Sequence, residues 1–245
     1  MRLFAPVLAV LTAGSVALPV AAQDNLVTLG VFVTVRTENL PDFEQAAREH
    51  NAWHASQDDP QPWITYQALT GHGEYAVLAP NMTWASVDAP VVDMGTDVAH
   101  WAESGAAFVE TEETVLWTSI PGGNPPTDPT QYPVVQVYEF EINSGGQPAA
   151  MNTIERANEA LAETGIQFEW SAVISQDGPP SVFLALWFQN FDALGTPSPG
   201  PEQIMADTFG PGQGARILAD FSEATTARSS QIWILRPDLS YTPAM

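Results

Sequence analysis

Residues 182–188 read Val182-Phe183-Leu184-Ala185-Leu186-Trp187-Phe188, an unbroken apolar run. A β-strand with one face in water alternates apolar and polar residues, because successive side chains point to opposite faces of the sheet. This run does not alternate, so we expect both of its faces to be buried. Val27–Val35 (VTLGVFVTV) and Tyr75–Ala79 (YAVLA) also carry apolar residues on both faces. The sheet that contains such strands must be covered on both sides.

The same order of elements is predicted on each side of a Pro/Gly-rich stretch, Pro121–Pro129. Before it, hydrophobic periodicity predicts strand, helix, strand, strand, helix and strand at 27–35, 39–55, 63–69, 75–79, 96–109 and 114–120. After it, the same order is predicted at 134–142, 149–163, 168–175, 182–188, 203–228 and 231–235. In the first half we expect Thr96 to cap the second helix and Val98 and Trp101 to lie on its apolar stripe.

This order is the split unit of ferredoxin-like folds, in which both helices cover one face of an antiparallel sheet. The second face of each sheet must then be covered by the other sheet. We therefore predict an α+β fold with two ferredoxin-like βαββαβ units in tandem and an eight-stranded barrel-like core, with helices outside. The predicted boundaries are a signal peptide at 1–22, units at 23–121 and 133–239, a linker at 122–132 and a tail at 240–245.

The first residues predict export. Arg2 is followed by an apolar run from Leu3 to Val20, broken by prolines and a glycine, and Ala21-Ala22 follows. One positive charge, a short apolar run and small residues at its end are typical of a signal peptide cleaved after Ala22. A membrane-anchoring helix is the alternative. We expect a periplasmic or secreted protein without a membrane segment after cleavage.

The composition excludes several classes of function. The chain has 29 acidic and 7 basic residues, a formal charge of −22, and no cysteine. A surface of this charge repels nucleic acid and anionic lipid, so we expect neither as a partner. Without cysteine there is no disulfide, no thiol nucleophile and no thiolate metal ligand. The sequence also lacks a Gly-rich phosphate loop, a serine nucleophile elbow and an EF-hand.

All the histidines lie in the first half, and they are His50, His54, His72 and His100. His50 and His54 are spaced i, i+4, so their imidazoles share the face of the first helix that is turned toward the sheet. The matching positions of the second half are Ala157 and Leu161. The spacing predicts a polar ligand pocket with His50 and His54 as metal ligands or as an acid–base pair, beside Asn51 and Trp53.

A structural role is the alternative, with His54 near an exposed helix end and His50 half-buried. A metal ion would need a third ligand, from His72 or from a carboxylate elsewhere. The order HNAWH also lacks the glutamate of the HExxH zinc proteases. We expect His72, in a Gly-His-Gly turn, and His100, off the apolar stripe of its helix, to face solvent.

Similar stretches follow the third strand of each unit, Met82-Thr83-Trp84-Ala85 and Gln189-Asn190-Phe191-Asp192. Together with the order of elements, they make residues 26–237 resemble the dimeric α+β barrel superfamily in a fused form. That superfamily includes antibiotic-biosynthesis-type monooxygenases, haem-degrading enzymes, chlorite-dismutase-like haem proteins and dye-decolorising peroxidases, so the resemblance implies the fold but no single activity.

The resemblance also bears on cofactors. The chlorite-dismutase-like and peroxidase members hold haem through a histidine of the C-terminal copy, and this chain has no histidine after His100. Haem held in that way is not expected, whereas haem on His50 or His54 stays open. We predict no cofactor, with metal or haem as the less favoured alternatives.

Three functions remain open. The first is binding of a small apolar molecule, or a scaffold role, in a monomer with an intramolecular pseudo-dimer or in a homo-oligomer. The alternative is a monooxygenase-type oxidoreductase with its pocket in the first unit. The third is an interaction module that associates through a strand edge or its acidic face. Polar groups that converge between the sheet and helices of the first unit would favour the enzyme.

Overall fold

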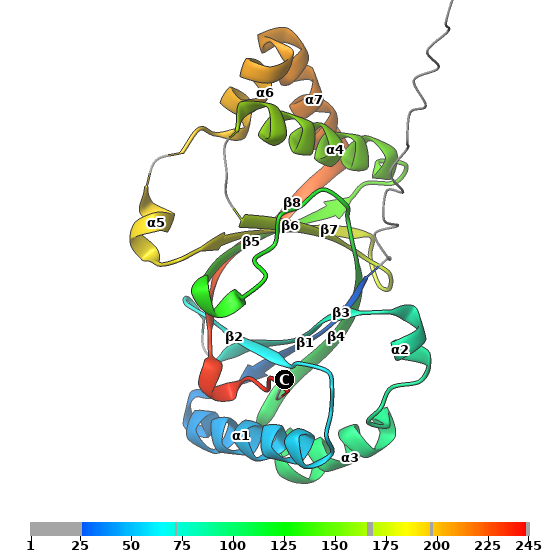
Figure 1. Cartoon of the computed structure of the whole chain (residues 1–245), viewed down its shortest axis with the longest axis vertical. Coiled ribbons are helices and arrows are strands. Elements are labelled where there is room, and N and C mark those ends of the chain that lie inside the picture. Colours follow the sequence, from blue (N-terminus) through cyan, green and yellow to red (C-terminus); the bar gives the residue numbers. More distant parts are fainter. Residues whose placement is uncertain (1–25, 72, 166–168, 197, 244–245) are drawn as a thin grey trace, which may run out of the picture.

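The computed structural model describes residues 26–71, 73–165, 169–196 and 198–243. The predicted signal peptide and His72 lie outside the described residues. Eight antiparallel strands form one closed barrel, with helices above and below it in Figure 1. No helix of the described ranges is long and apolar enough to cross a membrane.

The two halves contain the same main elements. The first half contains β1 (Val27–Val35), α1 (Leu40–Ser56), β2 (Ile64–Ala68), β3 (Glu74–Met82), α2 (Trp84–Asp88), α3 (Met94–Ser104) and β4 (Val109–Ser119). The second half contains β5 (Val134–Ile142), α4 (Gln147–Thr164), β6 (Glu169–Ser175), β7 (Ser181–Phe188), α5 (Phe191–Gly195), α6 (Pro201–Phe209), α7 (Pro211–Ala224) and β8 (Thr225–Leu235). Short 3-10 turns occupy Thr37–Asn39, Ala106–Phe108, Pro129–Gln131 and Pro237–Leu239.

The barrel is closed at two junctions between the halves. Its strand order is β1-β3-β2-β8-β5-β7-β6-β4, so in each half the first strand lies between the third and the fourth. At one junction Tyr66 of β2 pairs with Leu235 of β8, and at the other Trp117 of β4 pairs with Ser175 of β6. The predicted fold class is confirmed, and the two sheets are in addition hydrogen-bonded edge to edge into one barrel.

Aromatic side chains from both halves fill the barrel. The Phe32 ring lies 5.6 Å from that of Trp117 and 6.0 Å from that of Trp233, and Trp117 lies 5.3 Å from Phe183. The neighbouring residues of β1, Val33 and Val35, point out of the barrel and pack under the helices of the first half. Both faces of β1 are therefore buried, as its sequence predicts.

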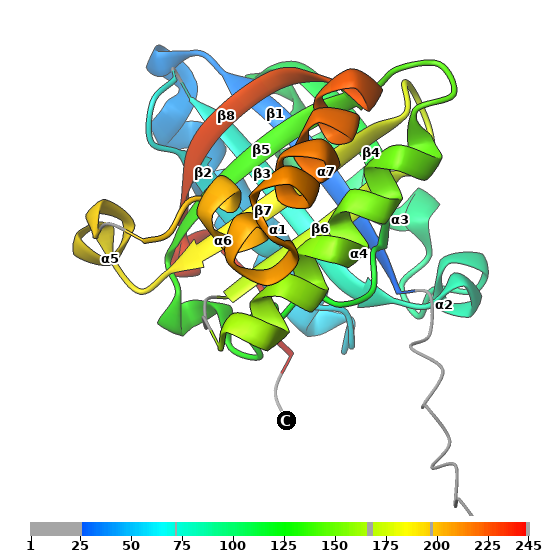
Figure 2. The same ribbon diagram turned by 90° about the horizontal axis from the view of Figure 1, so that it is seen from above.

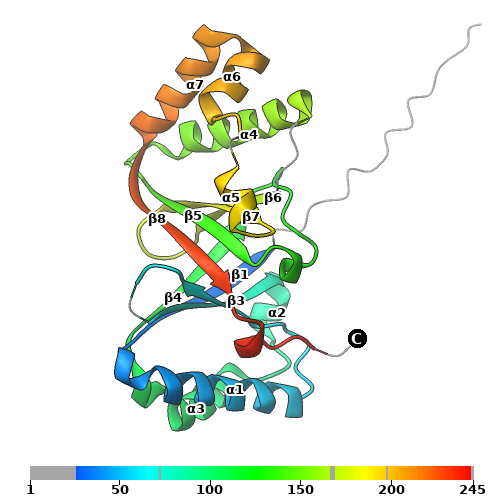
Figure 3. The ribbon, with the colours of Figure 1, turned by 90° about the vertical axis from the view of Figure 1, so that its left-hand side faces the viewer.

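The helices form two separate layers. Helices α1 and α3 cover the first half of the barrel, and α4, α6 and α7 cover the second, as Figure 3 shows from the side and Figure 2 from above. The second layer is tightly packed, because Ala157 and Leu161 of α4 lie against a buried cluster from α4, α6 and α7 (Ala160, Ile204, Met205, Ile217).

Helix α3 differs from its prediction. It begins at Met94, and the carboxylate of Asp93 caps it by accepting the backbone N–H of Thr96 at 3.0 Å. Thr96 is therefore not the cap. Val98 lies with Trp101 on the cavity side of the helix, as predicted, but it is at the rim and 61% exposed. The helix ends before Gly105, whose missing side chain leaves room for the Trp101 ring.

The sequence pattern did not predict the first residues of two strands or the presence of two short helices. Strands β4 and β8 begin earlier than predicted, at Val109 and Thr225. Their first residues are mostly polar and exposed, so they show no apolar signal although they pair with β1 and β5. The short helices α2 and α5 begin at the Trp84 and Phe191 stretches and were not predicted.

Candidate functional site

A cavity of about 280 Å³ lies between the first-half sheet and its helix layer. Its floor is the outer face of β1 and β3, and its walls come from α1, α2, α3 and the segment before α3. Most of the lining is apolar, as in Leu29, Val31, Val77, Val87, Val92 and Trp101. The rim is apolar too, because Val91, Met94 and Val98 line the cavity while being 73%, 48% and 61% exposed.

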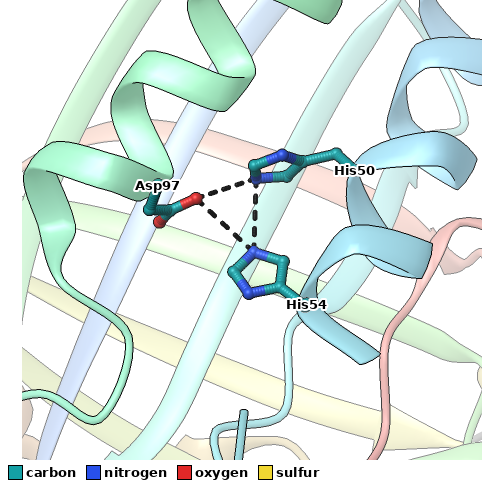
Figure 4. Close-up of side chains that lie close together, drawn as sticks. All are labelled: His50, His54 and Asp97. Atoms are coloured by element: carbon teal, nitrogen blue, oxygen red, sulfur yellow. Dashed lines mark hydrogen bonds and ion pairs between the residues drawn. The ribbon is translucent and has the colours of Figure 1, made fainter. Parts of the chain in front are cut away.

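Polar groups converge at one place in this lining. His50 and His54 lie one turn apart on α1, and Asp97 faces them from the first turn of α3 (Figure 4). The Nε2 of His50 lies 2.9 Å from Oδ1 of Asp97, and the Nε2 of His54 lies 3.5 Å from the same oxygen. The two Nε2 atoms are 3.2 Å apart. Three potential metal-ligand atoms thus form a small triangle.

The other nitrogen of His54 lies against a buried carboxylate. Its Nδ1 is 2.8 Å from Oδ2 of Asp59, a close electrostatic contact without ideal hydrogen-bond direction. Asp59 is held in place because it accepts hydrogen bonds from the indole N–H of Trp63 at 3.1 Å and from the backbone N–H of Gln61 at 2.9 Å. The Tyr241 hydroxyl donates to the Asp59 carbonyl at 2.6 Å. These contacts fix Asp59, and Asp59 in turn holds the Nδ1 side of the His54 ring.

The other nitrogen of His50 also has a close neighbour, which is a third histidine. Its Nδ1 lies 2.8 Å from Nδ1 of His100, so one of the two rings donates this hydrogen bond and the other accepts it. The Trp53 ring stacks on both, with ring centres 5.5 Å from His50 and 4.7 Å from His100. His100 is half-buried, so the expectation that it faces solvent is wrong. Its side chain supports the candidate site.

Burial decides the charge of His54. Its side chain is 2% exposed, which contradicts the interpretation that places it at an exposed helix end. Burial lowers the pKa of His54, and a positive charge on His50 lowers that pKa further, although Asp97 and Asp59 act in the opposite direction. A neutral imidazole at pH 7 keeps a lone pair that can bind a cation.

The remaining predicted residues have supporting positions. Asn51 lines the cavity and donates its side-chain N–H to the carbonyl of Leu239 at 2.8 Å, which ties α1 to the C-terminal segment. Trp53 contacts the histidines from outside the cavity lining. The sequence reasoning missed Asp59 and Asp97. The one signal for Asp97 was its place three residues before His100, in a predicted helix.

Haem does not fit this site. The titratable groups that line the cavity, among the described residues, are His50, His54, Asp59, Asp97 and Glu112, with no arginine or lysine. The two propionates of a haem would face these carboxylates without a cationic partner.

Comparison with known proteins identifies the fold. No protein-family model and no curated sequence matches the chain. Among solved structures, an anthrone oxidase-like protein is similar over 91% of this chain and 95% of its own, with a TM-score of 0.58 and 7% identity. A candidate monooxygenase from Lactobacillus acidophilus NCFM covers 89% of this chain and 97% of its own, with a TM-score of 0.57 and 8% identity.

A chlorite dismutase variant from Candidatus Nitrospira defluvii is also similar, over 88% of this chain and 93% of its own, with a TM-score of 0.56 and 8% identity. These neighbours are dimeric α+β barrel proteins. The chain therefore has the dimeric α+β barrel fold, with the barrel closed within one polypeptide. Identities this low show the fold and leave the activity to be argued from the site.

Proposed function

We propose that the chain is an oxidoreductase of the monooxygenase type, which binds a small, mainly apolar organic molecule in the first-half cavity. The observation that carries the proposal is an apolar cavity whose lining contains the polar cluster of His50, His54 and Asp97. An apolar pocket with a few convergent polar groups is the usual form of a small-molecule active site. A pure scaffold would not need these groups.

The cavity rim supports the choice of ligand. Val91, Met94 and Val98 expose apolar surface around the opening, and the lining carboxylates disfavour an anion. A neutral, flat or branched hydrocarbon skeleton fits such a surface. The descriptions of two similar structures, a candidate monooxygenase and an anthrone oxidase-like protein, support oxidation as the reaction class. For an activated CH₂ group the balanced reaction with O₂ gives a ketone and water, and the substrate itself supplies all four electrons.

Binding is tested with the neutral fluorescent probe N-phenyl-1-naphthylamine. We expect saturable binding of one probe per chain, and at least about tenfold weaker binding by Val77→Phe, because the larger side chain fills the cavity floor. The control is Leu69→Phe, the same kind of enlargement at a position that is 47% exposed and outside the cavity lining. Equal binding by both variants and the unchanged chain would place the probe elsewhere and overturn the assignment of the pocket.

Catalysis is tested by O₂ consumption and anthraquinone formation from anthrone, over the rate without protein at pH 7. We expect the unchanged chain and Leu69→Phe to accelerate the reaction, and Asp97→Asn to lose most of the acceleration. Probe binding without any acceleration by the unchanged chain would reject the oxidoreductase and favour the second candidate function, a binding protein for apolar molecules. The apolar rim and lining are the observations that favour that candidate.

A further inference from the structure

We infer that His50, His54 and Asp97 form a binding site for one divalent first-row transition-metal ion. The inference concerns the chemistry of the cluster in the proposed active site, but metal binding does not depend on the organic ligand. The three residues each offer one ligand atom, and these atoms lie within 4.8 Å of one another.

The size of the triangle fits one ion. Its sides are 2.9, 3.5 and 3.2 Å between the two Nε2 atoms and Oδ1 of Asp97. Ligands that sit roughly 2.1 Å from a common ion, in octahedral or tetrahedral geometry, lie about 3.0 to 3.4 Å apart. An ion about 1 Å above the plane of the triangle would therefore contact all three atoms without movement of the backbone.

One arrangement of the ring protons leaves both Nε2 atoms free to bind an ion. With Nδ1 of His54 protonated toward Asp59, its Nε2 carries a lone pair. With Nδ1 of His50 donating to His100, the Nε2 of His50 carries a lone pair as well. Three electron-rich atoms then lie within 3.5 Å of one another, and a cation beside them relieves their repulsion.

The surroundings have the form of an outer ligand shell. Metal-bound histidines usually place their second nitrogen against a carboxylate or another acceptor, which fixes the ring and raises its basicity. Asp59 has this position behind His54, and His100 has it behind His50. His54 and Asp59 are 2% and 4% exposed, so this support is built into the core rather than assembled on the surface.

The ligand set selects the class of ion. Two neutral imidazoles and one carboxylate carry a charge of −1 and leave a divalent ion with a net positive charge. Imidazole ligands favour iron, zinc, cobalt, nickel or copper over magnesium and calcium. Two histidines and one carboxylate on one side of an ion, with free positions on the other, are the pattern of non-haem iron(II) oxygenases. Here all three residues line the cavity, so the free positions can face its contents.

The test is a titration of the EDTA-treated full chain with Co²⁺, followed by visible absorption and by calorimetry. We expect one Co²⁺ per chain with a visible absorption band that is stronger than that of hydrated Co²⁺ and displaced from it. The variant Asp97→Asn keeps the size of the side chain and is expected to weaken binding by more than about 100-fold. The control is Glu112→Gln, which removes a carboxylate of the same cavity outside the triangle and should bind as the unchanged chain does.

A chain this acidic can also bind Co²⁺ loosely through surface carboxylates. Binding with no more than the weak visible absorption of hydrated Co²⁺, or binding equal in Asp97→Asn and Glu112→Gln, would assign the ion to that surface and overturn the inference. Circular dichroism and thermal melting check that the variants are folded. The probe binding proposed above is measured without metal, so failure of this inference and failure of the pocket assignment give different results.

Discussion

Gly30 tests whether the two halves are packed as one barrel. A Cβ atom at this position of β1 would lie 2.4 and 2.5 Å from two ring atoms of Trp117, and 3.3 Å from the side chain of Leu78. The Trp117 ring in turn packs against Phe32 and against Phe183 of the other half. Gly30→Ala therefore requires the ring at the centre of the barrel to move.

The expected cost combines two effects. Overpacking of a filled core costs about 1 to 3 kcal/mol. Loss of the extra freedom of glycine in the unfolded chain offsets about 0.4 to 1 kcal/mol of this. We expect a net loss of roughly 1 to 2 kcal/mol in the free energy of unfolding, which for a chain of this size lowers the melting temperature by about 2 to 8 °C.

The assay is urea unfolding of the metal-free chain, followed by far-UV circular dichroism. Gly212→Ala is the matched control, because it makes the same change in the first turn of α7 with nothing within 4 Å of the new atom, and it should stabilise the chain slightly. In a Trp117→Leu background, Gly30→Ala should cost at least about 1 kcal/mol less. If Gly30→Ala stabilises the chain as Gly212→Ala does, the packing argument for the barrel is refuted.

Three further predictions concern the first half. Arg236 holds the pKa of Asp238 at about 2, below its usual 3.8, so this pair stabilises the fold above pH 4 and ceases to do so as the pH falls toward 2. Because Asp238 is 47% exposed, the contribution is at most about 1 kcal/mol, and urea midpoints at pH 6 and pH 2.5 should differ less in Arg236→Leu than in the unchanged chain. Asp59→Asn should weaken Co²⁺ binding by about 10- to 100-fold while the ion still gives a visible band; an unchanged affinity would remove Asp59 from the ligand shell. Asp93→Ala removes the cap of α3 and should cost about 1 kcal/mol in urea unfolding and also weaken Co²⁺ binding, since Asp97 lies in the first turn of that helix; a loss of stability with unchanged affinity would mean that the cap does not position the carboxylate.

The sequence predicts those features that depend on local pattern. Strands that are apolar on both faces, such as 182–188, require cover on both sides, and the order of elements allows only a helix layer and a second sheet to supply it. The proximity of His50 and His54 follows from the period of one helix. Neither inference depends on how elements that are distant in the sequence are positioned.

The rest of the candidate site depends on how α3 and the segment after α1 lie against α1. Asp97 faces the histidines only because α3 begins at Met94 and crosses α1 in a particular rotation. The stripe of Val98 and Trp101 identifies the cavity side of this helix, but it does not show that α1 places His50 and Trp53 against His100. Asp59 lies in a turn whose path is fixed by Trp63 and Tyr241, a contact that spans most of the chain.

The second half of the barrel, which contains no histidine, shows how its described residues pack without a cluster of this kind. There the first helix presents Ala157 and Leu161 where α1 presents His50 and His54, and α6 and α7 pack closely over them. Burial of two imidazoles and two carboxylates in the first half costs free energy unless each group has a partner. The sheet and helices can form without these groups, as the second half demonstrates, so stability alone does not account for them. The cation site inferred above would give both Nε2 atoms and Asp97 one common partner.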